Sequence, residues 1–311
     1  MRILITGGAG FIGSHVADAL IERGHRVTIL DNLSSGREEN VNRRAKFYKF
    51  DLGNRKRLEK LFEKIQPEAV FHFAAQINVR TSVEDPLSDA ATNIMSSLSL
   101  IDLAMKHAVK KFIFSSTGGA MFDDTTLRPT PESISAVPLS PYGIAKLSIE
   151  HYLRFFHQVH GLPYVILRYA NVYGPRQNAH GEAGVVSIFL TRMLEGTSPT
   201  INGDGFQTRD YVYVSDVAEA NVKALDSTIQ EGVFHIGTGI ETSVNDIFRM
   251  LNWQFGKTFE EIHGPAQSGE TKASSLDAHQ AKRHLGWEPK VALAEGLVAT
   301  ATWFKARSRE N

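Results

Sequence analysis

Tyr142 and Lys146 are the two side chains of this sequence best suited to moving a proton. They stand four positions apart, just after Ser140 and Pro141, which are typical of a helix start, so they share one helical face. A phenol has an ordinary pKa near ~10, and a neighbouring cation favours its ionised form. The pair could therefore make tyrosine a proton acceptor near neutral pH. An ordinary solvent-facing turn can show the same spacing, so the rest of the chain must decide.

Three glycines near the start of the chain predict a dinucleotide site. Gly7, Gly10 and Gly13 lie between an apolar strand pattern at 2–6 and a helical pattern at 15–23. Glycines in a strand–turn–helix unit permit a tight turn and let backbone N–H groups approach a pyrophosphate. The spacing G-x-x-G-x-x-G differs from the commoner G-x-G-x-x-G, so the prediction depends on this strand and helix context.

Asp31 predicts which dinucleotide binds. It follows a second strand pattern at 26–30. A carboxylate at that point accepts the ribose hydroxyls of NAD and repels the 2′-phosphate of NADP. The nearest following arginine is Arg37. We therefore predict NAD in preference to NADP.

The later chain alternates strand and helix patterns. Strands are predicted at 46–50, 69–73, 111–114 and 163–168, with helices at 55–64, 89–107 and 142–159. This alternation predicts an α/β fold with a doubly wound parallel sheet (Rossmann). We expect an NAD-binding domain at 1–169, with segments near 206–238 crossing back to it. We expect a smaller mixed α/β substrate-binding lobe at 170–311, a surface loop over the site at 121–139, and a strand with a hairpin turn at 200–205.

Composition narrows the function classes. The 311 residues are 42% hydrophobic and 22% charged, and 34 basic residues balance 34 acidic ones. This is a soluble globular composition that suggests no nucleic-acid or membrane partner. The chain has no cysteine, and its first residues form a strand pattern rather than a signal peptide. We expect a cytoplasmic protein without thiolate chemistry and predict no metal site.

Motifs along nearly the whole chain resemble one enzyme family. They are Thr-Gly-Gly-Ala-Gly-Phe-Ile-Gly at 6–13, Asp-Asn-Leu at 31–33, Ser-Ser-Thr at 115–117, the Tyr142/Lys146 pair, Leu-Arg-Tyr-Ala-Asn-Val-Tyr-Gly-Pro-Arg at 167–176, Arg-Asp-Tyr-Val-Tyr-Val at 209–214 and Leu-Gly-Trp at 285–287. In order and spacing the chain resembles the extended short-chain dehydrogenase/reductase superfamily, and most closely the UDP-glucose 4-epimerases and their UDP-hexose relatives.

The resemblance implies a mechanism. Tyr142 would take the proton of the sugar 4-hydroxyl while hydride leaves C4 for NAD. Lys146 would bond the nicotinamide ribose and lower the pKa of Tyr142, and Thr117 would bond the sugar hydroxyl. The keto intermediate would turn over and take hydride back on its other face, interconverting UDP-glucose and UDP-galactose or a related UDP-hexose.

Further contacts are predicted for both ligands. We expect NAD to be contacted by Tyr142, Lys146 and by Gly7, Gly10, Phe11, Ile12, Gly13, Asp31, Asn32, Asp51, Leu52, Ala74, Ala75, Asn93 and Tyr169. We expect the substrate to be contacted by Thr117, Asn171, Arg209, Gln267 and Lys272. Asn93 could instead bond neighbouring backbone, and His72 reads as a satisfied core residue.

Several positions depart from the family pattern. Phe122 replaces a usual tyrosine and is followed by Asp123 and Asp124. Gln267 and Lys272 stand where relatives often have arginine, and Glu270 replaces an aspartate. Lysine keeps the charge of arginine but loses its bidentate fork, so substrate identity is left open.

Three different functions therefore stay open beside the epimerase. One is another NAD-dependent nucleotide-sugar enzyme, namely a UDP-uronate 4-epimerase, a decarboxylase or a dehydratase. A dehydratase needs an Asp-Glu pair directly after the Ser/Thr, and the pair Gly118 and Gly119 after Thr117 argues against it. The second is a simple alcohol dehydrogenase. The third is a non-catalytic NAD-sensing protein, although such proteins typically lose the tyrosine or lysine.

A homodimer is also expected. In relatives the helices that hold Asn93 and Tyr142 pair with their copies across a dimer. Both helices carry apolar residues beyond those needed for one face, such as Leu98, Ile101, Leu153 and Phe156.

Overall fold

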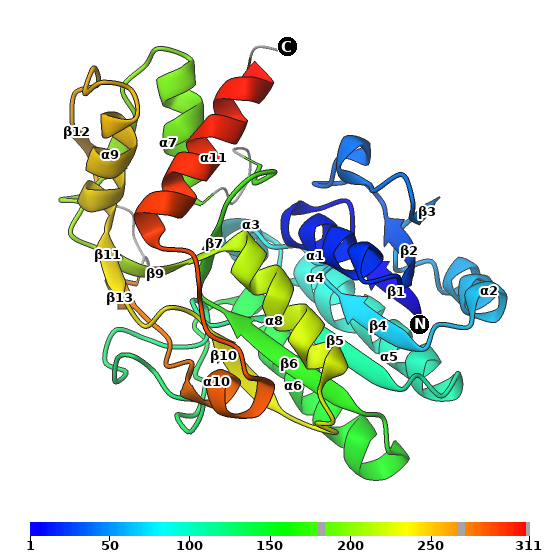
Figure 1. Ribbon diagram of the computed structural model, residues 1–311. Coiled ribbons are helices and arrows are strands. Elements are labelled where there is room, and N and C mark those ends of the chain that lie inside the picture. Colours follow the sequence, from blue (N-terminus) through cyan, green and yellow to red (C-terminus); the bar gives the residue numbers. More distant parts are fainter. Residues whose placement is uncertain (179–183, 267–270, 309–311) are drawn as a thin grey trace.

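Seven parallel strands form the main sheet of this computed structural model, which describes residues 1–178, 184–266 and 271–308 (Figure 1). The strands, in sheet order, are β10 (Val233–Ile236), β6 (Tyr164–Tyr169), β5 (Lys111–Thr117), β4 (Ala69–His72), β1 (Arg2–Thr6), β2 (Arg26–Asp31) and β3 (Lys46–Lys49). The chain order reverses between β1 and β4, and in sheets of this kind ligands bind outside the carboxyl ends of the strands at such a switch point. The predicted doubly wound α/β fold is confirmed.

Helices cover both faces of this sheet. One face is covered by α1 (Phe11–Glu22), α8 (Val214–Asp226) and α10 (His279–Leu285), and the other by α2 (Arg55–Ile65), α5 (Ser96–Lys106) and α6 (Pro141–His160). Successive strand residues serve opposite faces: Ile3 and Ile5 join the core under α1 and α8, whereas Leu4 joins the core under α2, α5 and α6. Burial on both faces explains why the strands read as continuous apolar runs.

Helix α6 begins where its sequence predicts. The hydroxyl of Ser140 accepts a hydrogen bond from the Gly143 N–H at 3.2 Å, and Pro141 takes the first helical position. At the other end Gly161 adopts φ 71°, a left-handed conformation that suits glycine. Ser140 and Pro141 together set where the helix begins, so the position of Tyr142 in its first turn follows from local sequence.

The long helix expected at 89–107 is present, but a π-helical turn interrupts its α-helical hydrogen bonding. The chain forms α3 (Val79–Glu84), α4 (Pro86–Ala90), a π-helical turn η2 (Ala91–Met95) and then α5. Hydroxyls compete for backbone carbonyls in this stretch, since Ser96 donates to the Ala91 carbonyl at 3.1 Å and Ser97 to the Asn93 carbonyl at 2.7 Å. Such turns are frequent at functional sites, and this one contains Asn93.

The remaining elements build a smaller mixed assembly. They are β7 (Asn171–Tyr173), α7 (Val185–Leu194), β8 (Thr200–Asn202), β9 (Thr208–Tyr213), β11 (Glu241–Ser243), α9 (Val244–Trp253), β12 (Ile262–Gly264), β13 (Ala273–Ser274) and α11 (Leu293–Ser308). A 3₁₀ turn, η1 (Glu38–Asn40), follows β2 in the chain and precedes β3. Figure 1 shows α7, α9 and α11 gathered to one side of the main sheet, where they share a separate core. Strand β9 pairs with β7, β11 and β13.

One local expectation in this part is only half right. The strand expected at 200–205 forms as β8, but it does not turn back as a hairpin and pairs in parallel with the distant β12. Strand β7 forms because β9 offers it a parallel partner. Both pairings depend on segments far away in the sequence. The division into a 1–169 domain and a 170–311 lobe stays a prediction, although β10 and α8 do lie with the main sheet.

The apolar residues chosen as extra surface on the two dimer helices are in fact core residues. Ile101 and Leu153 are fully buried, and Leu98 and Phe156 pack against the same core. The sheet-facing side of each helix is broader than the periodicity suggested. Within the described part of the chain, no helix is both long enough and apolar enough to cross a membrane.

Candidate active site

The glycine turn joins β1 to α1 at the switch point of the sheet. Gly7 has φ +70°, and a Cβ on it would lie 2.5 Å from the Ala74 nitrogen. A Cβ on Gly13 would lie 2.3 Å from the Gly7 carbonyl oxygen. Any side chain at either position would therefore displace backbone. Gly10 begins α1 with no side-chain cap, so the first N–H groups of this helix face the crevice without a side-chain acceptor from that residue.

Asp31 is fixed at the carboxyl end of β2. Its two carboxylate oxygens accept backbone N–H groups, from Ala9 at 3.0 Å and from Leu33 at 2.8 Å. Beside it, the Asn32 amide donates to the Asp51 carboxylate at 2.7 Å, so these predicted cofactor residues form one cluster. This geometry leaves lone pairs of a well-oriented carboxylate for ribose hydroxyls.

The structure brings the predicted catalytic residues to the ends of β5 and α6. Lys146 is only 5% exposed and donates from Nζ to the Ser115 carbonyl at 2.8 Å. Its Nζ lies 5.9 Å from the centre of the Tyr142 ring. Thr117 is the last residue of β5, and its hydroxyl accepts the Ala120 N–H at 3.3 Å. A cation, a phenol and a hydroxyl thus gather at the sheet edge where ligands collect.

Two buried carboxylates surround the charge of Lys146. Burial lowers the pKa of Lys146 to about 8, while Glu150 and then Asp89 act in the opposite direction. Glu150 already has a cation, because Arg168 binds it through Nη2 at 2.6 Å and Nε at 3.0 Å. The Ser116 hydroxyl donates to the same carboxylate at 2.5 Å. This network ties α6 to both β5 and β6.

Asp89 differs from Glu150 because its hydrogen-bond donors are neutral. Its Oδ1 accepts from the Gln76 side chain at 3.0 Å and from the Asn93 side chain at 2.9 Å. Asn93 also exchanges hydrogen bonds with the backbone of Gln76, at 2.8 Å in both directions. Asn93 therefore hydrogen-bonds neighbouring backbone, which is one of the two roles predicted for it. It holds the segment that directly follows Ala74 and Ala75.

Two buried side chains take structural roles. The Tyr169 hydroxyl exchanges hydrogen bonds with Asn221 on α8, at 3.1 and 2.9 Å, and burial raises the pKa of Tyr169. The predicted contact of Tyr169 with the cofactor stays a prediction. His72 bonds the hydroxyls of Thr6 and Ser97, both at 2.7 Å, and burial lowers its pKa to about 3. The reading of His72 as a satisfied core residue is confirmed.

Three of the predicted substrate residues, Asn171, Arg209 and Lys272, lie on the smaller assembly. Asn171 starts β7, and a Cβ on Gly119 would lie 3.8 Å from its Oδ1, so it faces the turn after Thr117. Arg209 on β9 donates only to the neighbouring Thr208 carbonyl, at 2.8 Å, and has no carboxylate partner among the described residues. Lys272 accepts the Thr208 N–H at its carbonyl, at 2.9 Å. Gln267 and Glu270 lie outside the described residues.

Sequence reasoning missed Asp89, Gln76, Glu150 and Arg168. Two signals were available. Glu150 follows Lys146 by one helical turn, so it had to share its face. Arg168 ends an apolar strand next to Tyr169, where a buried cation needs an acid.

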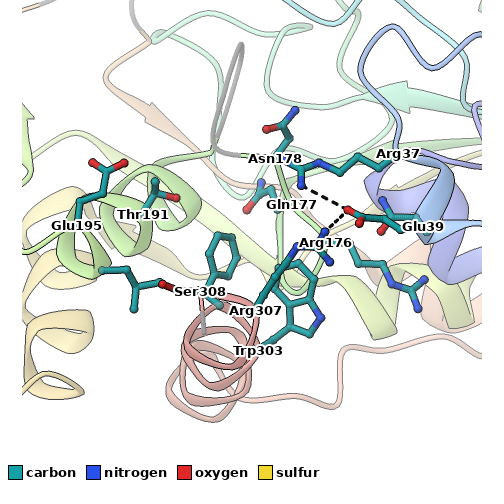
Figure 2. A pocket seen from close by; sticks show the side chains of 13 residues that line it. Arg37, Glu39, Arg176, Gln177, Asn178, Thr191, Glu195, Trp303, Arg307 and Ser308 are labelled. Carbon is teal, nitrogen blue, oxygen red and sulfur yellow. Dashed lines mark hydrogen bonds and ion pairs between the residues drawn. The ribbon is translucent and has the colours of Figure 1, made fainter. Parts of the chain in front are cut away.

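A separate cavity of about 280 Å³ lies between α7, α11 and the loop after β2. Figure 2 shows Glu39 between Arg37 and Arg307 in its wall, with Trp303 beside Arg307. Another wall residue, Arg176, is paired with Asp18, which does not line the cavity, at 2.7 Å. None of the predicted site residues lines this cavity. Arg37 and Arg307 share the carboxylate of Glu39, and the 3.4 Å contact of Arg37 with Glu39 is a half-exposed ion pair.

Comparison with known proteins identifies the family. The model of the NAD dependent epimerase/dehydratase family matches residues 3–237. The chain belongs to this family. A UDP-glucose 4-epimerase of Mycolicibacterium smegmatis is 40% identical over 314 residues, covering 99% of this chain and 100% of the relative. The resemblance to this family predicted from sequence is confirmed.

Solved structures agree with this assignment. The crystal structure of the UDP-glucose 4-epimerase of Thermotoga maritima with UDP-glucose is 52% identical, with a TM-score of 0.96 and coverage of 99% of each chain. The UDP-glucose 4-epimerase of Thermus thermophilus in complex with NAD is 41% identical, with a TM-score of 0.92, covering 98% of this chain and 99% of that one.

Proposed function

We propose that this epimerase-family protein interconverts UDP-glucose and UDP-galactose at C4, using tightly held NAD. The observation that carries the proposal is the meeting of Thr117, Tyr142 and Lys146 at the end of β5, beside the glycine turn. The cradle fits the cofactor, because Gly7 and Gly13 let the backbone of β1, α1 and the Phe73–Ala74 segment pack closely at the start of α1, where N–H groups can meet a pyrophosphate. Asp31 would accept the adenosine ribose hydroxyls, which favours NAD over NADP.

The chain's own residues would manage the proton. Tyr142 would accept the proton of the sugar 4-hydroxyl and return it after the sugar has turned over. Lys146 would stabilise the tyrosinate, while Thr117 would hold the same sugar hydroxyl by a hydrogen bond. NAD, when bound, supplies the acceptor and then the donor of the C4 hydride. Asn171 would bind the sugar nucleotide, and Arg209 and Lys272 would bind its diphosphate through charge-assisted hydrogen bonds.

Product analysis tests the proposal. Incubation of the purified protein with UDP-galactose should yield UDP-glucose by chromatography without stoichiometric NADH in solution, because hydride leaves and returns within one turnover. Stoichiometric NADH release would favour an alcohol dehydrogenase. A panel that includes UDP-uronates separates a uronate 4-epimerase from a decarboxylase, since decarboxylation releases carbon dioxide. Binding of NAD without conversion of any UDP-sugar would favour an NAD-sensing protein.

We also propose a cytoplasmic homodimer. Helices α3, α4 and α6 contact one another and expose large apolar side chains, namely Val83, Leu87, Ile144, Tyr152, Phe155 and Val159. Exposed apolar groups gathered on packed helices mark an interface, and the expected pairing of these helices with their copies would cover them. Sedimentation showing only monomer at micromolar concentration would contradict this.

A further inference from the structure

The loop after Thr117 is fastened to the smaller assembly through Asp124, the second of two consecutive aspartates. Asp123 serves its own turn, since its Oδ1 accepts the Thr125 N–H at 3.0 Å. Asp124 reaches much further along the chain. Its Oδ1 accepts the backbone N–H of Lys272 at 2.5 Å and that of Ala273 at 3.3 Å. Of the two aspartates that depart from the family pattern, Asp123 therefore bonds locally and Asp124 bonds a distant segment.

Arg128 continues this fastening a few residues later. Its Nη1 donates to the Asp124 carbonyl at 3.0 Å, and its Nε donates to Glu241 at 3.0 Å. Glu241 in turn accepts the hydroxyl of Thr208 at 2.6 Å and that of Ser275 at 3.2 Å. We call Asp124, Arg128 and Glu241 the loop clamp. It connects the loop at 121–139 with β11, β9 and the segment after β13.

The segment held by the loop clamp lies against Arg209. In β13, Ala273 pairs with Thr208 and Ser274 pairs with Arg209. Lys272 precedes β13 directly. The two cations assigned to the diphosphate thus stand on neighbouring backbone segments. Asp124 bonds the backbone of one of them.

From this geometry we propose that Asp124 is a positioning residue for the nucleotide diphosphate. The inference rests on the proposed function. Lysine is a point charge on a flexible stem, so the place of the Lys272 backbone decides where its charge can reach. Asp124 also starts from the loop that follows Thr117, so it sets the spacing between the diphosphate end and the reacting sugar. Its effect depends on accepting hydrogen bonds, since a negative charge near a diphosphate is by itself unfavourable.

Three variants separate these contributions. Asp124→Ala removes both long-range hydrogen bonds. Asp124→Asn keeps an acceptor oxygen and removes the charge. Asp123→Ala is the matched control, because that neighbouring acid bonds only within its own turn.

The experiment titrates NAD-loaded protein with UDP by calorimetry and measures UDP-galactose turnover. Asp124→Ala should weaken UDP binding and raise KM by about three- to tenfold, the loss expected for one or two hydrogen bonds, with kcat within about twofold. Asp124→Asn should bind UDP as tightly as wild type or tighter, and Asp123→Ala should match wild type. In a Lys272→Ala background, Asp124→Ala should add almost nothing, because the two act in series.

Arg209→Ala distinguishes failure of the inference from failure of the proposed function. Unchanged UDP binding in Asp124→Ala, with weakened binding in Arg209→Ala, would overturn the inference alone. Unchanged binding in both would overturn the proposed diphosphate site as well. Equal losses in Asp124→Ala and Asp124→Asn, or full additivity with Lys272→Ala, would show that Asp124 does not act by holding the Lys272 backbone.

Discussion

The two ends of the proposed substrate site are built in opposite ways. At the reacting end, Lys146 is buried, and its ammonium is held by a strand carbonyl beside the fixed Glu150–Arg168 pair. At the nucleotide end, Arg209 is half-buried and its only hydrogen-bond partner within the described residues is a neighbouring carbonyl, and Lys272 is exposed. One end has its charges arranged before any ligand arrives. The other presents cations whose partners would come with the substrate.

The contrast follows from what each end must do. Proton transfer requires donor and acceptor within about 2.6–3.2 Å, so the tyrosine and lysine have to be held rigidly. Binding a diphosphate tolerates more variation, because charge attraction falls slowly with distance. We expect substitutions at the reacting end to lower kcat, and those at the nucleotide end to weaken binding.

The largest expected effect is that of Tyr142→Phe. This change removes only the hydroxyl, so the rate should fall by about 10²–10⁴-fold while NAD still binds. Turnover of UDP-galactose and titration with NAD measure the two quantities separately. Near wild-type turnover in Tyr142→Phe would remove the basis for distinguishing the two ends.

Arg209→Ala tests the nucleotide end. Losing a hydrogen bond to a charged group costs about 1.5–3 kcal/mol, so UDP affinity should fall by roughly ten- to a hundredfold. Turnover at saturating substrate should fall much less than in Tyr142→Phe. Calorimetry with UDP, together with separate measurement of KM and kcat, checks both statements. A lower kcat at unchanged KM in Arg209→Ala would contradict the assignment of binding to the nucleotide end.

What the sequence could predict follows the same division. The glycine turn, Asp31 and the Tyr142 helix are each set by residues within one strand–turn–helix unit, so local pattern sufficed. The pairing of β8 with β12, and the bonds from Asp124 to residues 272 and 273, join segments separated by tens of residues or more. Neither has a local signature. The π turn at η2 was also hidden, because hydroxyl bonds to backbone change a helix without changing its apolar period.

Asp31→Ala tests the cofactor side. The variant should lose part of its NAD affinity and gain relative affinity for NADP, since the carboxylate that repels a 2′-phosphate is gone. Tight NADP binding is not expected, because the substitution adds no cation to bind the 2′-phosphate. Calorimetry with both cofactors measures the ratio; equal affinities already in wild type would mean that Asp31 does not select NAD.

The smallest expected effect concerns the pH dependence of the reacting end. The titratable and charged groups around Lys146 are Tyr142 and Glu150 on α6, Asp89 on α4, His72 on β4 and, behind Glu150, Arg168 on β6. Asp89 is the acid among them whose hydrogen-bond donors are all neutral. The negative charge of Asp89 therefore favours the protonated form of Lys146, and neither of its neutral donors, Gln76 and Asn93, offsets that charge.

Asp89→Asn removes this charge and keeps an oxygen for both donors. The pKa of Lys146, lowered by burial to about 8, should fall further because a negative neighbour no longer favours the ammonium. Since the protonated lysine stabilises the tyrosinate, activity should then be lost at a lower pH on the alkaline side. The expected displacement is up to about one pH unit.

Asp85→Asn is the matched control for this shift. Asp85 caps α4 by accepting the Ser88 N–H at 3.0 Å, and asparagine caps equally well while removing one exposed charge. Its kcat/KM profile against pH should coincide with that of wild type. A profile for Asp89→Asn that is lower at every pH but not displaced would assign Asp89 to structure alone. A displacement toward higher pH would contradict the electrostatic argument, because loss of a negative charge cannot favour the protonated lysine.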